Sequence, residues 1–346
     1  MLMSDSEQKI IKATEVDLKI VFSDILKGYT IMKRKKQQQT FYIKHLSLFD
    51  NIVTDTLYRD SLKEAKEKKL PTEKEKAEYL AKEDLWTKKQ DMELAGLVKY
   101  VENLRTTKSK MYLSSQIKEI KGQIEENEEK IFELTREKDH LLGYTAEKYA
   151  TKRSNEVYIQ QAVFKHEECE QLAISEEEFD YMTDEELNKF VMDYNESTQF
   201  ITIDNIKKLS LMPFFCNYFY LCDDNPMTFY GKPVVDLSYY QSELFTFGRY
   251  FKNLIQNSDI SPPDEIRNDP DKMIEFYESN KNAKEVMDKM DQKLGDKSGA
   301  TSLVGATKED LQALGIKTGN QGLNLSKIAA EKGGQLDMKD FMDLHG

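Results

Sequence analysis

Four side chains of this sequence could bind a transition metal: His166, Cys169, Cys216 and Cys222. The His-x-x-Cys spacing of the first pair suits zinc, whereas the two later cysteines are loosely spaced inside an apolar segment. A Cys–His nucleophilic pair is the other chemistry open to them, but no third group supports it. We favour thiols that pack as small hydrophobic side chains, and we expect no metal and no other cofactor.

The motifs of the common enzyme classes are missing. The stretch GATKED (Gly305–Asp310) lacks the second glycine and the Gly-Lys-Ser/Thr ending of a phosphate-binding loop. The sequence has no Gly-x-Ser-x-Gly elbow and no His-Glu-x-x-His helix, and its acidic runs lack the spacing of a calcium loop. We therefore expect a protein that is not an enzyme.

Composition predicts a mainly α fold. Of the 346 residues, 39% are hydrophobic and 32% charged, with only 15 Gly and 7 Pro, a mixture typical of long helices with wide solvent faces. The net charge of −12 argues against binding to nucleic acid or to an anionic membrane surface. The three cysteines suggest reduced thiols in a cytosolic compartment, and the first residues do not resemble a signal peptide.

Aromatic residues are concentrated between Phe214 and Phe251, where thirteen of thirty-eight positions are Phe or Tyr. The apolar run within this stretch is too short to span a bilayer, which needs about 20 residues. A helix that starts at Pro213 and another that starts after Ser238, hinged by a Pro/Gly turn, predict a buried core. Exposed rings at the rim could form a docking face, and our candidates are Tyr239, Tyr240 and Tyr250.

Helical segments are also predicted elsewhere. Residues 16–32 place Val16, Ile20, Val21, Ile25 and Leu26 at helical spacing, with Gly28 as the stop. The segment 40–70 starts with a β-like cluster and continues as a helix. Capping signals mark further helix starts, and Trp86 is expected to anchor the turn between two of them. These capping residues are Thr72, Thr87, Thr145, Ser175, Thr183 and Ser238.

Two runs of apolar residues at 3-4 spacing predict a long antiparallel coiled-coil hairpin. The second run carries a polar residue, Asn127, at a core position, where such a residue fixes register at some cost in stability. A parallel, oligomeric coiled coil is the alternative. The apolar positions of the runs are Leu94, Leu97, Val101, Leu104, Ile117, Ile120, Ile124, Ile131, Leu134 and Leu141.

The last fifty-two residues contain nine of the fifteen glycines and three short amphipathic islands. Each island is too short to form a stable helix alone, so we expect an extended Gly-rich C-terminal tail that folds on a partner. The large apolar side chains of these short amphipathic islands are our candidate partner-binding residues: Leu311, Leu314, Ile328, Leu336, Phe341 and Leu344.

These signals divide the chain into five segments. They are an N-terminal helical segment (1–70), the helical hairpin (71–143), an aromatic-rich helical unit (144–260), a linker and helix (261–294) and the tail with its docking helices (295–346). The expected fold is therefore a helical body with a coiled-coil hairpin and an extended tail.

Two stretches also suggest a family. One begins with LPTEKEKAEYLAKEDLWTKKQ and ends after the hairpin with LTREKDHLLGYTAEKYATKRSNEVYI; the other is FFCNYFYLCDDNPMTFYGKPVVDLSYYQSELFTFGRYFKNLI. They resemble proteins encoded beside virion structural genes in tailed bacteriophages, which are associated with tail or baseplate assembly and head–tail structure. The resemblance implies a virion component or assembly factor that acts through protein contacts. It carries over no functional residue.

We therefore expect a non-enzymatic phage structural or assembly protein whose partners are other virion or assembly proteins, with neither specific nucleic acid nor membrane among them. Copies of the chain could also form a homo-oligomer within an assembly. The resemblance implies a location in the host cytoplasm during assembly or in the virion. The alternative is an assembly chaperone or regulatory binding module that is absent from the mature particle.

Overall fold

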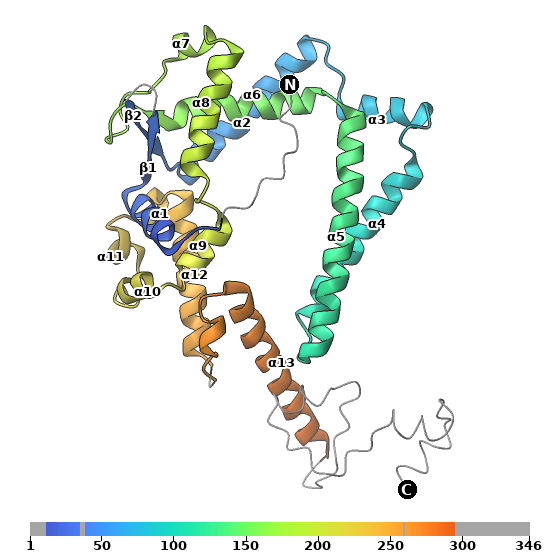
Figure 1. The fold of residues 1–346 in the computed structure, drawn as a ribbon, viewed down its shortest axis with the longest axis vertical. Helices are drawn as coiled ribbons and strands as arrows, with labels where there is room; N and C mark the ends of the chain where they lie inside the picture. The colour runs from blue at the N-terminus through green and yellow to red at the C-terminus, as the bar shows by residue number, and fades with distance from the viewer. Residues whose placement is uncertain (1–11, 35–38, 259, 295–346) are drawn as a thin grey trace. The chain divides into compact units, whose positions relative to one another are not determined.

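The computed structural model describes residues 12–34, 39–258 and 260–294 (Figure 1). It confirms a mainly α protein, to which a small three-stranded sheet is added. The described residues form two compact units, one made of residues up to 98 with 130–277, the other of residues 99–129 with 278–294. Within the described part of the chain, no helix is both long enough and apolar enough to cross a membrane.

The elements have the following bounds. The helices are α1 (Glu15–Lys27), α2 (Leu48–Glu67), α3 (Glu73–Lys82), α4 (Lys88–Lys108), α5 (Ser114–Leu142), α6 (Ala146–Ala162), α7 (Glu176–Asp180), α8 (Asp184–Thr198), α9 (Ile203–Leu209), α10 (Pro213–Phe219), α11 (Pro226–Tyr230), α12 (Tyr239–Gln256) and α13 (Pro270–Leu294). The strands are β1 (Tyr29–Arg34), β2 (Gln39–Lys44) and β3 (Val163–Phe164), and two 3₁₀ turns cover Val234–Asp236 and Asp264–Ile266.

The strands form an antiparallel sheet in the order β1-β2-β3, in which Tyr29 pairs with Lys44 and Arg34 with Gln39. Sequence analysis predicted β structure only at the start of the segment 40–70, so it missed β1. Met32 and Ile43 of the sheet are buried against α6 and α8 in one core cluster.

Most of the predicted helix starts carry the expected caps, whereas at Thr87 a hydrogen bond of 2.8 Å runs from its N–H to Gln90 Oε1. The side chains of Thr72, Ser175, Thr183 and Ser238 each accept a hydrogen bond from the third N–H of their helix, and the third residue's side chain accepts one in return. Thr145 caps α6 by the first of these bonds alone. Such caps satisfy N–H groups that have no partner within the helix, which explains why the helices start at these residues.

Trp86 anchors the turn between α3 and α4, as predicted. Its side chain is buried, and its Nε1 donates a hydrogen bond of 2.8 Å to an Asp91 carboxylate oxygen. The same oxygen lies 2.7 Å from Lys138 Nζ of α5. Hydrogen bonds from Lys138 and Trp86 hold the pKa of Asp91 below its usual value.

Helices α4 and α5 run antiparallel, joined by a short turn. Two ion pairs connect them: Asp91 with Lys138, and Arg105 with Glu128 at 2.6 Å. Residues later in α4 thus pair with residues earlier in α5. Asn127 is half-buried, and its Nδ2 donates a hydrogen bond of 2.6 Å to the Gln123 carbonyl of its own helix. The apolar positions buried here are Val101, Leu104, Ile117, Ile120 and Ile124.

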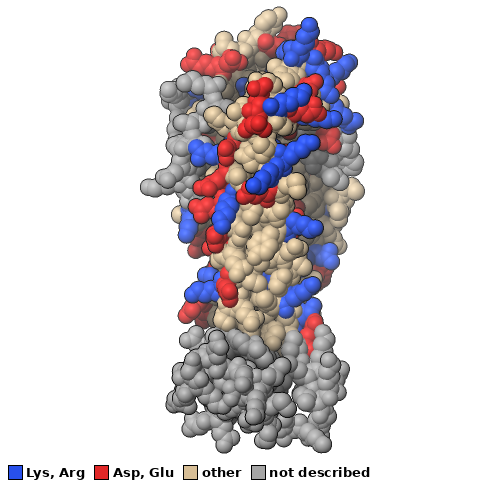
Figure 2. Space-filling model, turned by 90° about the vertical axis from the view of Figure 1, so that its right-hand side faces the viewer, with Lys and Arg blue, Asp and Glu red and all other residues tan. Residues whose placement is uncertain are grey.

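The outer face of these helices carries many charges. Figure 2 shows Lys and Arg side chains interspersed with Asp and Glu, beside a strip of uncharged side chains. Among the exposed apolar residues of α4 and α5 are Met92 and Phe132. A mixed-sign surface of this kind is typical of a solvated helical face.

The aromatic segment forms a buried core, as predicted. Phe219 of α10 stacks on Phe215 with ring centroids 5.0 Å apart, and it meets Phe229 and Phe245 edge-on at 5.5 and 5.3 Å. The cluster also buries Leu18, Val21 and Ile25 of α1. The N-terminal helix and the aromatic-rich unit, assigned to different segments of the chain, therefore share one core.

Close packing of two rings of this core against α12 requires a glycine at position 248. A Cβ built on Gly248 of α12 would lie 2.9 Å from the Cζ atoms of both Phe215 and Phe219, which are fully buried. We expect Gly248→Val to destabilise the protein by about 1–3 kcal/mol in urea unfolding, because the two rings must move. Gly96→Ala on α4 is the matched control.

A Cβ at Gly96 would meet nothing within 4 Å. Its replacement by alanine should therefore stabilise the protein by about 0.5–1 kcal/mol, the helix-propensity difference alone. Equal stabilities of the Gly248 variant and the wild type would contradict the close approach.

Helix α13 starts beside the aromatic core and ends the described chain. Within the first unit, Met273 and Tyr277 are buried with Leu211 and Phe251. Within the second unit, the Asn282 side chain donates hydrogen bonds of 2.9 and 3.0 Å to the Ser109 and Met111 carbonyls.

Candidate functional site

The four candidate metal ligands are not gathered into one site. Cys222 is buried in the aromatic core, where its thiol lies 2.9 Å from the Phe219 carbonyl oxygen. Cys216 is half-buried in α10, and His166 is exposed in the loop that holds Cys169. Burial raises the pKa of both the Cys169 and Cys216 thiols, which makes them poor nucleophiles at neutral pH. Among the described residues, no group of three metal-ligating side chains stands together.

Helix α1 carries apolar side chains on more than one of its sides. Val21 and Ile25 are buried in the core as predicted. Val16 and Ile20, expected on the same face, are instead 65% and 55% exposed, and Leu26 is 40% exposed. The solvent side of α1 thus mixes the apolar side chains of Val16 and Ile20 with the charged side chains of Glu15, Lys19 and Lys27, all of them exposed.

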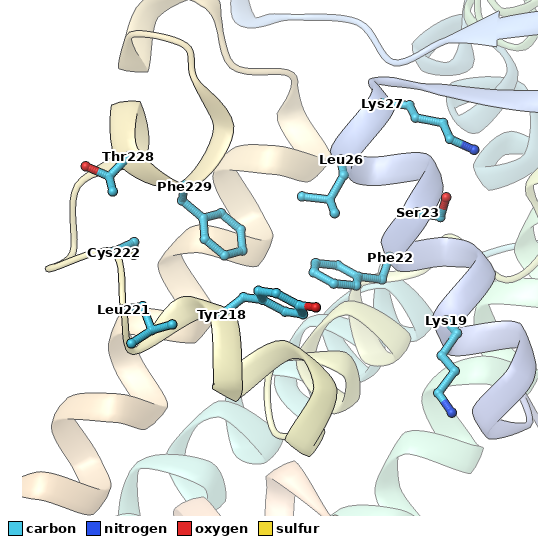
Figure 3. A pocket seen from close by; sticks show the side chains of 10 residues that line it. All are labelled: Lys19, Phe22, Ser23, Leu26, Lys27, Tyr218, Leu221, Cys222, Thr228 and Phe229. Atoms are coloured by element: carbon cyan, nitrogen blue, oxygen red, sulfur yellow. The ribbon is translucent and has the colours of Figure 1, made fainter.

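A groove of about 630 Å³ lies between α1 and the segment containing α10 and α11. Figure 3 shows the side chains of Phe22, Leu26, Tyr218 and Phe229 pointing toward its middle from the two sides. Tyr218 and Leu221 on the α10 side are 66% and 77% exposed. The groove therefore continues into an open apolar surface, and we call the two together the α1–α10 groove.

The charged residues lining the α1–α10 groove are lysines only. Lys19 and Lys27 lie on its α1 side, and no Asp or Glu is part of the lining. Lys19 pairs with Glu15 at 2.7 Å, and its Nζ lies 5.6 Å from the centre of the Phe214 ring. In a chain of net charge −12, a groove with basic residues and no carboxylate favours an acidic ligand.

The wall that α1 forms is tied to the core by Gln241 of α12, which is buried. Its Nε2 donates a hydrogen bond of 2.9 Å to the Ile25 carbonyl, and the Leu26 carbonyl lies 3.4 Å away. Its Oε1 accepts a 3.1 Å bond from the Ser238 N–H. One amide thus satisfies backbone groups at the end of one helix and at the start of another.

A second concavity, of about 330 Å³, is polar. It contains His45, whose Nε2 lies 2.8 Å from the Thr30 hydroxyl and whose pKa is lowered to about 4 by burial, so the ring is neutral at physiological pH. Three lysines and three carboxylates share the lining, so the charges balance and favour no class of ligand. These charged residues are Lys27, Lys44, Lys232, Asp50, Glu167 and Asp236.

Two of the three tyrosines predicted to be exposed lie at the surface. Tyr239 and Tyr250 of α12 are exposed and lie about three turns apart on one side of the helix. Tyr240, also expected to be exposed, is half-buried, with its ring edge-on to His45 at 5.0 Å. Burial raises the pKa of Tyr240. The other candidates, Leu311, Leu314, Ile328, Leu336, Phe341 and Leu344, lie outside the described residues.

Sequence analysis missed the α1–α10 groove, although a signal for it was present. Residues 16–32 contain more apolar side chains than one helical face can hold, and they were all assigned to one face. Counting angles around the helix would have separated Val16 and Ile20 from Val21 and Ile25. The contribution of Tyr218 and Leu221 depends on how α10 packs, which spacing alone does not reveal.

The comparisons with known proteins add no further assignment. No protein-family model, no curated protein and no solved structure matches this chain.

Proposed function

We propose that this protein is a non-enzymatic structural or assembly protein that acts through protein–protein contacts, with the α1–α10 groove as a docking surface. The observation that carries the proposal is the exposed apolar surface at the groove, formed by Leu26 of α1 with Tyr218 and Leu221 on the α10 side. Apolar surface of this kind beside a groove is characteristic of interaction sites. Aromatic side chains at the groove are the residue type most enriched at the centre of interfaces.

The setting we propose is the assembly of a tailed-phage particle. The resemblance of two stretches of the chain to proteins encoded beside virion structural genes supports it. In this setting α4 and α5 act as a rigid coiled-coil arm, and residues 295–346 act as a tail that docks on a partner. The two ion pairs between α4 and α5 are compatible with such an arm.

Capture of partners from source lysate by groove variants tests the proposal. Tyr218→Asp combined with Leu221→Asp places two carboxylates on the open side of the groove. We expect recovery of the main partner to fall about tenfold or more, because aromatic anchors dominate binding energy. The measurement is quantitative mass spectrometry of proteins retained by each bait.

Phe132→Asp is the matched control, because Phe132 is 66% exposed, as is Tyr218, but lies on α5 outside the groove. It should retain the partner at the wild-type level. Retention of every partner by the groove variant would refute docking at this surface. The number of copies in purified particles then separates a structural component from a factor that leaves before maturation.

A further inference from the structure

The α1–α10 groove specifies the chemistry of its ligand. Its lining combines the rings of Phe22, Tyr218 and Phe229 with two lysines and no carboxylate. A short amphipathic helix that presents apolar side chains at positions i, i+3 and i+4 and carries a net negative charge would match both features.

This chain contains a segment of that composition. Residues Leu336–Leu344 read LDMKDFMDL, with three Asp against one Lys, and Met338, Phe341 and Met342 have the i, i+3, i+4 spacing of one helical face. Phe341 is the only aromatic residue after Leu294. The segment lies outside the described residues.

The two other islands of the tail match less well. Residues 307–314 contain two acidic residues against one Lys, and residues 325–333 contain two Lys against one Glu. Neither has an aromatic residue to enter a groove lined by rings. Charge and ring content therefore both select the segment 336–344.

We propose that the α1–α10 groove of one copy binds residues Leu336–Leu344 of a second copy. This rests on the proposed function, since an assembly built of many copies brings the segments of neighbouring chains close at high local concentration. The contact is heterologous: the surface used by one copy differs from that used by the next, so repetition gives a ring or a filament. Self-association through the groove is thus a route by which copies add head to tail.

Two full-length variants with complementary defects test the proposal. The groove variant is Tyr218→Asp with Leu221→Asp, both at exposed positions. The segment variant is Phe341→Asp with Leu344→Asp. We expect the wild type to self-associate in sedimentation experiments and each variant alone to remain monomeric at the same concentration. An equimolar mixture should form a 1:1 dimer and nothing larger, because it retains one intact groove and one intact segment per pair.

Two further variants probe specificity. Leu311→Asp with Leu314→Asp changes another island of the tail and should associate like the wild type. Lys19→Glu with Lys27→Glu should weaken association about tenfold, and Asp337→Lys with Asp340→Lys on the other copy should restore it.

Three results would overturn the proposal. One is a monomeric wild type whose α1 loses hydrogen-exchange protection in the Phe341 variant, which would mean that the groove is occupied within one chain. Another is a monomeric wild type whose α1 shows the same hydrogen-exchange protection as α1 of the Phe341 variant, which would mean that the segment does not bind the groove. The third is association that survives in the groove variant.

Sedimentation of the purified chain tests self-association, whereas capture from lysate tests binding of other proteins. Loss of a partner in the groove variant, combined with no dimer in the mixture, would reject the self-association and leave the proposed function standing.

Discussion

Replacing Phe219 by alanine is expected to destabilise the native protein by about 3–5 kcal/mol. The side chain is fully buried and contacts the rings of Phe215, Phe229 and Phe245 at centroid distances of 5.0 to 5.5 Å. Removing it leaves a cavity and breaks three aromatic pairs at once. Urea unfolding followed by circular dichroism measures the loss as a lower transition midpoint at unchanged slope.

Tyr218→Ala provides the control within the same helix. Tyr218 precedes Phe219 but is 66% exposed and lines the α1–α10 groove. Its replacement should change the free energy of unfolding by no more than about 0.5 kcal/mol, as is usual for surface positions. It should nevertheless weaken docking, because it removes a ring from the groove. A Phe219→Ala protein as stable as Tyr218→Ala would contradict the aromatic core described here.

The comparison between sequence and structure shows which signals were local. The caps at Thr72, Ser175, Thr183 and Ser238 were predicted correctly because a capping box involves residues only three positions apart. Trp86 was correctly assigned to an elbow for a similar reason. Its bonding partner Asp91 is five residues away.

Long-range packing could not be predicted in the same way. Gln241 and Ile25 are separated by 216 positions, and no spacing within α12 shows that its amide meets the end of α1. Strand β1 was missed because residues 16–32 were treated as one helical segment, although Tyr29, Thr30 and Ile31 favour a strand and β2 pairs with them. The half-burial of Tyr240 likewise depends on His45, which approaches from another part of the chain.

The α1–α10 groove depends both on a local sequence signal and on long-range packing. Apolar residues on more than one side of α1 were visible in the sequence, although they were assigned to one face. Which side faces the core depended on the aromatic cluster, which buries Leu18, Val21 and Ile25. Val16, Ile20 and Leu26 thereby remained on the outside. The docking surface that we propose on this helix consists of apolar side chains that the core leaves exposed.

Gln241→Glu is expected to produce a stability loss that depends on pH. In the native protein the Gln241 Nε2 donates to the Ile25 carbonyl within a buried environment. An ionised Glu has no hydrogen to donate, so it would place a carboxylate oxygen against that carbonyl. Burying the carboxylate and leaving the Ile25 carbonyl without a donor should together cost about 1–3 kcal/mol at pH 7, because Lys232, which lines the same concavity, offsets part of the cost of burying the charge.

The direction of the pH dependence follows from the protonated form. A neutral Glu can donate its proton to the Ile25 carbonyl, so folding favours that form and raises the pKa of the introduced Glu above its unfolded value of about 4.3. The additional loss should be nearly absent below that value and should grow as the pH rises through the folded pKa. Gln241→Met, which also lacks the donor but carries no charge, should lose stability by the same amount at each pH. Urea unfolding of both variants and the wild type at pH 4.5 and pH 7 measures the difference. A Glu variant whose loss relative to the wild type is the same at both values would show that position 241 is hydrated, and that α1 is held against α12 by apolar packing alone.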